Sequence, residues 1–391
     1  MIGNRSRRES SSPSGYYFRL AGYFRIGKYL SALVFALFMI MMLFVYGDKI
    51  TYNNFRYMLK DIDAAALLRT DATFETVNYQ TTDPSFASLN GNLVVADSGI
   101  VSLYNPAGIE VYSIPFASQR TEMVTDGKYL LVYDLGDRAF LLANSITQLI
   151  SDQAEGSLYA ADVSPSGAFA LAMSAQSTRY EIKVYNSSFS HSATYGFNDY
   201  VMGVSLSEDG KALAIVTLAG TGDVPDTSLR IGAVGEEIYR VIETVEGEFP
   251  VRIDWSGDRI LLETDAAVYF YSADGALLAR RSIGGRAMVA SCLSDTAYAV
   301  ATSKNGETLL TVFDRSGNVR YNEKTSDRVR DLAFCENGLL ILSVDRALHL
   351  SLDGFLLRET AVDDALDLLG VGSYGLVCGK HSANAIFVKQ H

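Results

Sequence analysis

The sequence is poor in the residues that build metal centres and nucleophilic active sites. Its 391 residues include only three cysteines and four histidines, and no C-x-x-C motif is present. The G-x-S-x-G elbow of serine hydrolases is missing, no P-loop lysine pattern occurs, and no G-x-G-x-x-G opens a helix after a strand. The sequence therefore predicts no catalytic residue, no metal ligand and no cofactor.

The three cysteines are evenly spaced but do not form a metal-binding pattern. Cys292, Cys335 and Cys378 follow one another at intervals of 43 residues. The first two fall at the ends of equivalent strands in a repeat, whereas Cys378 falls in a different strand of its own unit. An odd number of cysteines also argues against a disulfide framework, so we expect buried free thiols.

Positive charge is scarce outside the N-terminus. The chain carries a formal net charge of -12, although six basic residues and a single acid precede residue 29. An acidic body lacks the basic face that nucleic-acid binding needs to replace counterions. We therefore expect no nucleic-acid partner.

One long uncharged run stands out near the N-terminus. Residues 29–46 read YLSALVFALFMIMMLFVY, contain no charged residue and are flanked by tyrosines. As a helix this run would span about 27 Å, close to the hydrocarbon core of a bilayer. A buried core helix is the alternative, but such helices rarely lack a polar face over this length. We expect a transmembrane helix.

The flanks of this run predict its orientation. Basic residues concentrate before it, which places residues 1–28 in the cytoplasm as a basic tail and the rest outside the cytoplasmic membrane. A cleaved signal peptide is the competing interpretation, but the run is long and is followed by no small-residue cleavage pattern. An uncleaved signal anchor is favoured.

Residues 47–70 contain apolar side chains at helical spacing and predict a short stalk helix; a dimerising stalk is the alternative.

The remainder of the chain, residues 71–391, shows an internal repeat. Each unit of roughly 40 residues has an apolar strand, a glycine turn and a second strand, followed in most units by another hairpin. Seven units have the glycine, and an eighth near Ser294 lacks it. Four-stranded antiparallel units of this length are typical of β-propeller blades. The turn glycines are Gly91, Gly127, Gly167, Gly210, Gly257, Gly338 and Gly375.

The ring of blades needs a closing strand. The last unit supplies about three strands, and the alternating segment Thr73–Tyr79 precedes the first unit. Since a free strand edge invites aggregation, we expect this segment to become the outer strand of the last blade. The fold class is therefore all-β, a propeller of eight four-stranded blades, with seven blades as the alternative.

Taken together, these features resemble a known but uncharacterised group of proteins. A basic N-terminus, one signal anchor, the stalk NFRYMLKDID (Asn54–Asp63) and a propeller resemble a bacterial family of membrane-tethered propeller proteins, a domain of unknown function. The resemblance implies a location in the cell envelope. It supplies no established catalytic residues.

Candidate binding residues come from the loops between blades. Arginine forks bind carboxylates and phosphates in two-pronged fashion, so an arginine-rimmed channel mouth would receive an acidic ligand. The alternative is that these arginines pair with neighbouring acids such as Asp254 and Asp331. The candidates are Arg120, Arg252, Arg286, Arg328 and Arg330.

Three functions remain open from the sequence. The first is a non-catalytic binding or scaffolding propeller on the outer face of the cytoplasmic membrane, which recruits a protein or envelope polymer through its loops. The second is a cell-envelope hydrolase or lyase with carboxylates in the channel. The third is a ligand sensor. Fold alone does not choose among them.

Overall fold

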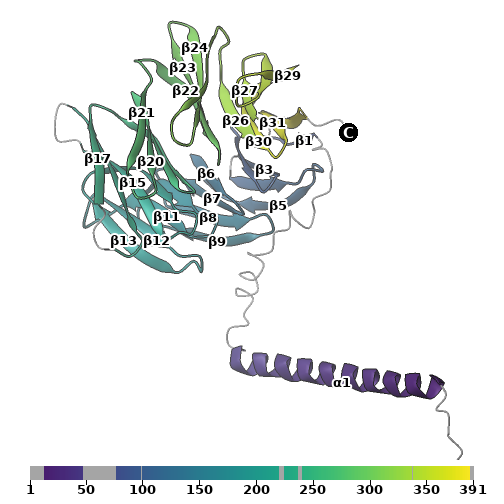
Figure 1. Cartoon of the computed structure of the whole chain (residues 1–391). Helices are drawn as coiled ribbons and strands as arrows, with labels where there is room; N and C mark the ends of the chain where they lie inside the picture. The colour runs from purple at the N-terminus through teal and green to yellow at the C-terminus, as the bar shows by residue number, and fades with distance from the viewer. Residues whose placement is uncertain are drawn as a thin grey trace, which may run out of the picture. The chain divides into compact units, whose positions relative to one another are not determined.

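The computed structural model describes residues 13–46, 76–97, 99–219, 224–236, 240–336 and 338–387. The chain divides into two units, residues 1–61 and 62–391, and each is described by itself. Among the described residues, the first unit contains one helix and the second an all-β domain (Figure 1). The stalk expected over residues 47–70 lies outside the described residues.

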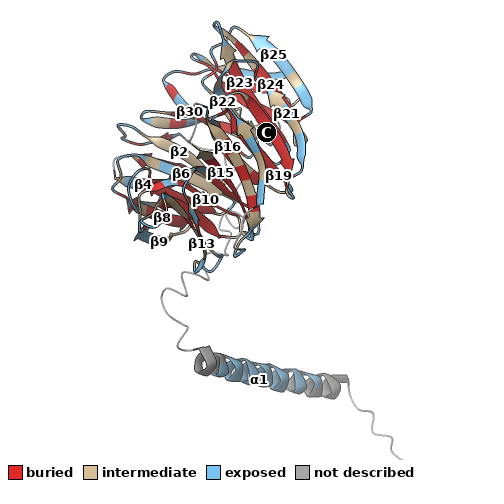
Figure 2. Cartoon of the chain, turned by 90° about the vertical axis from the view of Figure 1, so that its left-hand side faces the viewer, coloured by how far each residue is buried: buried red, intermediate tan, exposed pale blue. Residues whose placement is uncertain are grey.

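Helix α1 (Pro13–Tyr46) contains 34 residues. It confirms the helix expected over residues 29–46 but begins earlier, at a proline, a residue favoured in the first turn because it has no N–H to leave unbonded. Part of the expected basic tail is therefore helical. Residues 23–38 of this helix are exposed, and Figure 2 shows the middle of the helix in the colour of exposed residues. Within the described part of the chain, no helix is both long enough and apolar enough to cross a membrane, so the expected span is not supported.

The β-domain is a propeller of eight antiparallel sheets with four strands each, which excludes the seven-blade alternative. In every blade but the last, strand order in the sheet follows chain order. Blades 1 and 2 contain β2 (Ser85–Leu89), β3 (Asn92–Asp97), β4 (Ile100–Tyr104) and β5 (Glu110–Pro115), then β6 (Thr121–Asp126), β7 (Tyr129–Asp134), β8 (Ala139–Asn144) and β9 (Gln148–Gln153). Blades 3 and 4 contain β10 (Leu158–Val163), β11 (Phe169–Ser174), β12 (Tyr180–Tyr185) and β13 (His191–Phe197), then β14 (Tyr200–Leu206), β15 (Ala212–Ala219), β16 (Asp226–Ala233) and β17 (Arg240–Glu246).

The second half of the ring repeats the pattern. Blades 5 and 6 contain β18 (Pro250–Ser256), β19 (Arg259–Thr264), β20 (Ala267–Ser272) and β21 (Leu277–Ser282), then β22 (Ala287–Leu293), β23 (Ala297–Lys304), β24 (Glu307–Asp314) and β25 (Val319–Thr325). Blades 7 and 8 contain β26 (Asp331–Cys335), β27 (Gly338–Leu342), β28 (Arg346–Leu350) and β29 (Leu356–Ala361), then β30 (Ala365–Val371), β31 (Tyr374–Gly379), β32 (Ser382–Ile386) and β1 (Val77–Asn78).

Both ends of the chain build blade 8, as the sequence predicts. Strand β1 pairs antiparallel with β32, with Val77 opposite Ala383. Val77 is 1% exposed and packs in a cluster that includes Leu93 of blade 1 and Leu376 of blade 8. Figure 1 labels β1 beside β30 and β31, the strands with which it shares the last sheet. Residues 73–75 of the expected closing segment lie outside the described residues.

The core lies between neighbouring blades because each sheet has two apolar faces. Every residue of β7 is buried, whereas the outer strands of the blades are largely exposed (Figure 2). Between blades 2 and 3, for example, Leu131 and Leu142 pack in one cluster with Phe169. Each blade therefore buries its apolar side chains only against the next, which explains why the sheets form a ring.

Turn glycines also serve as contact points between blades. Gly210 has a φ of +68°, and a Cβ atom there would lie 2.4 Å from the Cβ of Ala168 in the preceding blade. Gly167 likewise faces the ring of Tyr129, one blade earlier. Glycine is therefore required at Gly210 both for its backbone conformation and for the close approach of two turns.

A buried carboxylate fixes the loop that leads into blade 2. Asp134, at the end of β7 and 3% exposed, accepts hydrogen bonds from the backbone N–H groups of Gln119 (3.1 Å) and Arg120 (2.9 Å). Asp97 accepts equivalent bonds from Thr82 and Asp83. The loops that join the blades are therefore held at defined positions around the ring.

Candidate functional site

The repeated strand order gives the ring two chemically different ends. The loops that join successive blades, and those between second and third strands, share one end, which we call the loop face. The hairpin turns between first and second strands, and between third and fourth strands, share the other, which we call the turn face. Innermost strands, such as β6 and β18, run from the loop face to the turn face.

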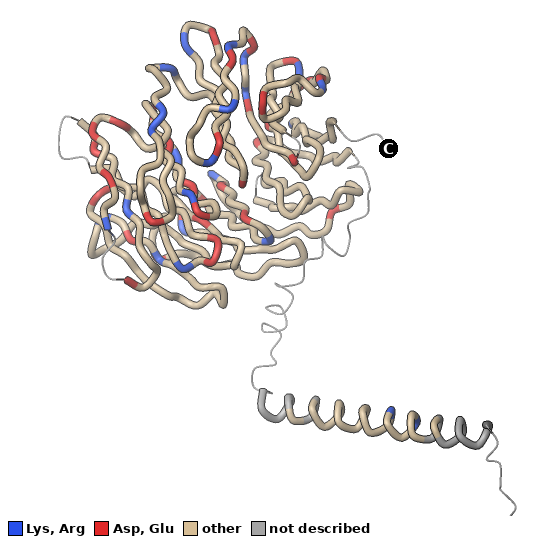
Figure 3. The backbone as a smooth tube through the Cα atoms, in the orientation of Figure 1, with Lys and Arg blue, Asp and Glu red and all other residues tan. Residues whose placement is uncertain are grey.

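A pocket of about 570 Å³ opens in the channel among blades 2 to 6. It is lined mainly by residues near the ends of innermost strands and in the turns that follow them. Acidic and basic positions are spread over the whole ring (Figure 3), but the pocket itself is dominated by acids. The carboxylates that line it are Asp126, Asp162, Glu208, Asp254 and Asp295.

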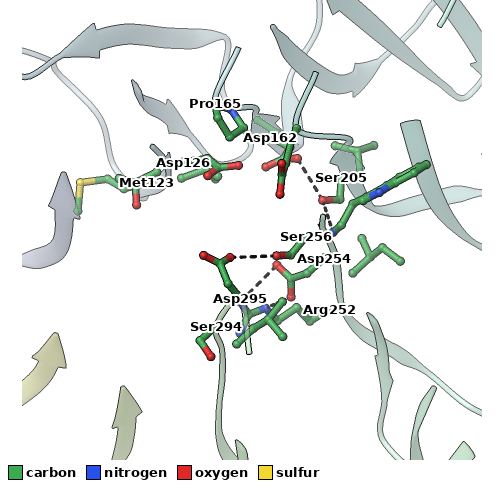
Figure 4. A pocket seen from close by; sticks show the side chains of 18 residues that line it. Met123, Asp126, Asp162, Pro165, Ser205, Arg252, Asp254, Ser256, Ser294 and Asp295 are labelled. Carbon is green, nitrogen blue, oxygen red and sulfur yellow. Dashed lines mark hydrogen bonds and ion pairs between the residues drawn. The ribbon is translucent and has the colours of Figure 1, made fainter. Parts of the chain in front are cut away.

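Several of these carboxylates face the same space. Figure 4 shows Asp126 and Asp162 on one side of the pocket and Asp254 and Asp295 on the other. Burial raises the pKa of Asp126 to about 6, and the negative charges of Glu208 and Asp295 add to this rise. Like charges in a partly desolvated space disfavour ionisation, so a cation placed among them would be strongly attracted.

Asp162 combines a pocket position with a structural role. One of its oxygens accepts hydrogen bonds from the backbone N–H of Leu206 (2.7 Å) and the hydroxyl of Ser205 (3.2 Å) in the next blade. Ser205 in turn accepts a bond from the backbone N–H of Trp255 at 2.9 Å, which links three blades. Burial raises the pKa of Asp162 to about 7, and the hydrogen bonds only partly oppose this rise.

Arg252 is the single cation among the described residues of the pocket lining, and its charge is already matched. Its Nε lies 2.5 Å from Oδ2 of Asp254, and it stands opposite Glu263 in the register of β18 and β19. Glu263 is fully buried and accepts a hydrogen bond from the hydroxyl of Ser291 at 3.0 Å. Burial raises the pKa of Glu263, and the positive charge of Arg252 partly opposes this rise. The pocket therefore keeps an excess of negative charge.

The other four predicted arginines lie on or near the loop face and do not line this pocket. Arg286 is fixed internally, because its guanidinium donates to the hydroxyl and carbonyl of Thr302 and to the carbonyl of Glu307. Arg120, Arg328 and Arg330 are exposed. Pairing with a nearby acid, the alternative for the whole set, occurs for Arg252, with Asp254, and for Arg286, whose guanidinium lies 3.8 Å from Oε2 of Glu307. Ligand binding by the arginines stays a prediction.

Carboxylates in the channel were considered from the sequence, but the residues that line the pocket were not identified, although a signal was present. Asp126 and Glu208 sit in the turn segments Thr125-Asp126-Gly127 and Glu208-Asp209-Gly210, where acids are expected as turn formers. What identifies them as pocket residues is their recurrence at the inner end of successive blades. Once the repeat is aligned, this recurrence predicts that the side chains meet at the channel.

The cysteines take the expected places. Cys292 and Cys335 lie in innermost strands and Cys378 in a second strand, and all three are free thiols. Cys378 is buried as expected, whereas Cys292 and Cys335 are only half-buried. Within the described ranges, no three His, Cys, Asp or Glu side chains are grouped so that they could hold a metal ion.

Comparisons with known proteins agree with the fold. The sequence model of DUF5711, described as a family of unknown function, matches residues 68–369. The crystal structure of BamB from Moraxella catarrhalis superposes with a TM-score of 0.53 at 12% identity, covering 81% of this chain and 99% of that chain. A structure described as the eukaryotic initiation factor gives a TM-score of 0.57 at 12% identity, covering 83% and 89%. At such identities the likeness shows only the fold. No curated protein matches the sequence.

Proposed function

Because the chain belongs to DUF5711, a family of unknown function, we propose its role from geometry: it is a non-catalytic binding propeller that takes a cationic group of a partner into its channel. The partner class is a protein, or an envelope polymer, that presents lysine- or arginine-like charge. The surrounding blades act as a rigid scaffold that holds the carboxylates in place.

The observation that carries this proposal is the unbalanced charge of the pocket. Five carboxylates line it, and Arg252 is already paired with Asp254. Burial and, after it, repulsion by Glu208 and Asp295 raise the pKa of Asp126. An incoming cation would relieve the repulsion, so binding and ionisation favour each other. Complementary charge of this kind gives specificity and speeds association.

A titration with trilysine tests the proposal. Asp126 and Asp162, with pKa values of about 6 and 7, are largely protonated at pH 5.5 and ionised at pH 8. We therefore expect trilysine to bind the full chain more tightly at pH 8 when measured calorimetrically at low salt. The double variant Asp126→Asn/Glu208→Gln should lose about tenfold in affinity, or about 1.4 kcal/mol.

The control removes the same charge elsewhere. Asp363→Asn/Asp364→Asn lies in the exposed loop before blade 8, on the loop face, and should leave trilysine affinity within about twofold. Equal losses in both variants would mean that only net charge matters. No binding to the unaltered chain, or affinity that does not rise with pH, would contradict the channel as the cation site.

The same carboxylates support a second candidate, a hydrolase or lyase acting in the channel. The observation that favours this candidate is the pKa of Asp162, which is raised to about 7, so this carboxyl could act as a general acid near neutral pH. Turnover of an envelope polysaccharide or peptide, lost in Asp162→Asn while the fold is kept, would favour this candidate. Carboxyl groups that only form ion pairs or anchor loops also have shifted pKa values, so a raised pKa does not by itself indicate catalysis. Binding therefore remains our first proposal.

The location that we propose, the outer face of the cytoplasmic membrane, is supported by sequence alone. Six basic residues precede the uncharged run over residues 29–46. If this is right, the full chain should stay with membranes after an alkaline wash, and added protease should reach the propeller only from outside the cell. Release by the wash would contradict anchoring, and protection from the protease would contradict the orientation.

A further inference from the structure

The innermost strands share an irregularity on the loop face. In five of the eight blades the pairing of the first and second strands slips by one residue close to the start of the innermost strand. Such a β-bulge turns one side chain away from the sheet, and bulges are kept where a side chain must be re-aimed. The residues turned out are Tyr159 in β10, Met202 in β14, Val251 in β18, Val289 in β22 and Leu366 in β30.

All five of these bulge residues are large and apolar, and all are exposed. Their exposed fractions lie between 41% and 57%. Because they occupy the same position in their blades, they stand around the channel on one face of the ring. Tyr200 and Phe249, beside two of them, are 42% and 49% exposed. An apolar ring repeated in this way is more than scattered surface hydrophobicity and indicates a contact surface.

Aromatic side chains extend this ring over blades 3 and 4. The ring of Tyr180 lies 5.3 Å from that of Tyr159 and 5.7 Å from that of Tyr200. The guanidinium of Arg179 stands 4.8 Å from the centre of the Tyr200 ring. Tyrosine and arginine are the residues that most often anchor protein interfaces, because they bury a large area and retain a polar group.

Two of the three blades without a bulge residue, blades 2 and 7, supply positive charge instead. Strands β6 and β26 pair with their neighbours without a slip, and the loops before them carry Arg120, Arg328 and Arg330. All three are exposed and form no ion pair with another described residue, while Arg330 donates a hydrogen bond to the carbonyl of Ala365 at 3.2 Å. The loop before blade 8 carries Asp363 and Asp364 instead, so the exposed arginines of the loops between blades are those before blades 2 and 7.

From this arrangement we propose that the loop face docks a partner protein through an acidic segment that also bears apolar side chains. The apolar side chains of the segment pack on the ring of bulge residues. Its Asp and Glu side chains pair with Arg120 on blade 2 and with Arg328 and Arg330 on blade 7. This site is separate from the cation pocket, which is lined mainly by residues near the turn face.

The test uses three synthetic peptides and the full chain. One 18-residue peptide combines leucine with glutamate, the second combines leucine with lysine, and the third replaces leucine with serine and keeps the glutamates. In fluorescence anisotropy at about 100 mM salt, the leucine–glutamate peptide should bind at least tenfold more tightly than the other two. Failure to bind, or equal binding of all three, overturns the proposal.

Two double variants assign the binding to the loop face. Met202→Ser/Val251→Ser should lower the affinity for the leucine–glutamate peptide at least tenfold. Arg328→Glu/Arg330→Glu should lower this affinity by as much and should also make the chain prefer the leucine–lysine peptide. The matched controls are Leu277→Ser/Val319→Ser, on outer strands and comparably exposed, and Lys211→Glu/Arg320→Glu, at exposed turn-face positions. Each control variant should bind the leucine–glutamate peptide with an affinity within about twofold of that of the unaltered chain.

Other occupants would give different results. If the loop face binds a second copy of the chain, Met202→Ser/Val251→Ser would abolish self-association in sedimentation while leaving peptide affinity unchanged. If it binds lipid, the same variant would instead lose binding to vesicles of phosphatidylglycerol and phosphatidylcholine. Either result overturns docking of an acidic protein segment. Trilysine binding should survive both loop-face variants, which separates this proposal from the function assigned to the channel.

Discussion

At the scale of single residues, position in the ring decides what a carboxylate does. Asp134 and Asp126 belong to the same blade, yet the first anchors a loop through two backbone N–H groups and the second faces the pocket. Both stand at strand ends, where sequence indicates only a turn or a cap. The chemistry of Asp126 follows from neighbours in other blades, such as Glu208 and Asp295, which no local pattern can reveal.

Gly210 offers a prediction at this scale. Alanine there would meet both a disfavoured backbone conformation, since φ is +68°, and the Cβ of Ala168 at 2.4 Å. We expect Gly210→Ala to lower the free energy of unfolding by about 2–4 kcal/mol, because the strain and the clash add. Urea denaturation of the full chain measures this change.

A second glycine separates the two contributions. Gly136 has a φ of +90°, but a Cβ atom at this position would have no other atom within 4 Å, so Gly136→Ala meets only backbone strain. We expect Gly136→Ala to lower the free energy of unfolding by about 1 kcal/mol. Equal costs at the two positions would show that the contact between blades 3 and 4 is looser than the structure indicates.

At the scale of strands and helices, the sequence predicts what is local and repeated. Turn glycines and alternating apolar residues mark each hairpin, so the eight four-stranded blades follow from the repeat. The return of β1 to blade 8 follows from counting strands in an incomplete last unit. The helix over residues 29–46 was also predictable, although its start at Pro13 was not, because residues 1–28 were predicted to form a basic tail.

The features that set the binding surfaces are not local in this sense. Tyr159 lies in a strand whose apolar and polar residues look like those of any other innermost strand, and its exposure results from a slip in pairing with β11. Register is a property of two strands together, so one strand's sequence does not report it. The ring of bulge residues was therefore missed, while the loop-face arginines could be placed because loops are marked by their turn residues.

At the scale of the whole molecule, closure of the ring gives each end a distinct chemistry. The channel pocket gathers acids from five blades, and the loop face displays apolar side chains flanked by arginines. Neither surface exists in a single blade. If both proposed sites are used, the protein would act as a scaffold that brings two partners together.

Ring closure through β1 is the central claim, and one cross-link tests it most directly. The hydroxyl of Thr76 donates to the side-chain oxygen of Asn384 at 2.9 Å, although 308 residues separate them. In the register of β1 and β32 these two residues are the next opposed pair, so cysteines there should reach each other. Mild oxidation of the full chain, followed by peptide mass mapping, reports the disulfide.

We predict near-complete formation of the disulfide in Thr76→Cys/Asn384→Cys and a rise in Tm, because the link locks the ring. The control pair Thr76→Cys/Asn322→Cys, with the second cysteine on the outer strand of blade 6, should form none. Absence of the first disulfide, or equal yields in the two variants, would contradict a propeller closed by its N-terminal strand.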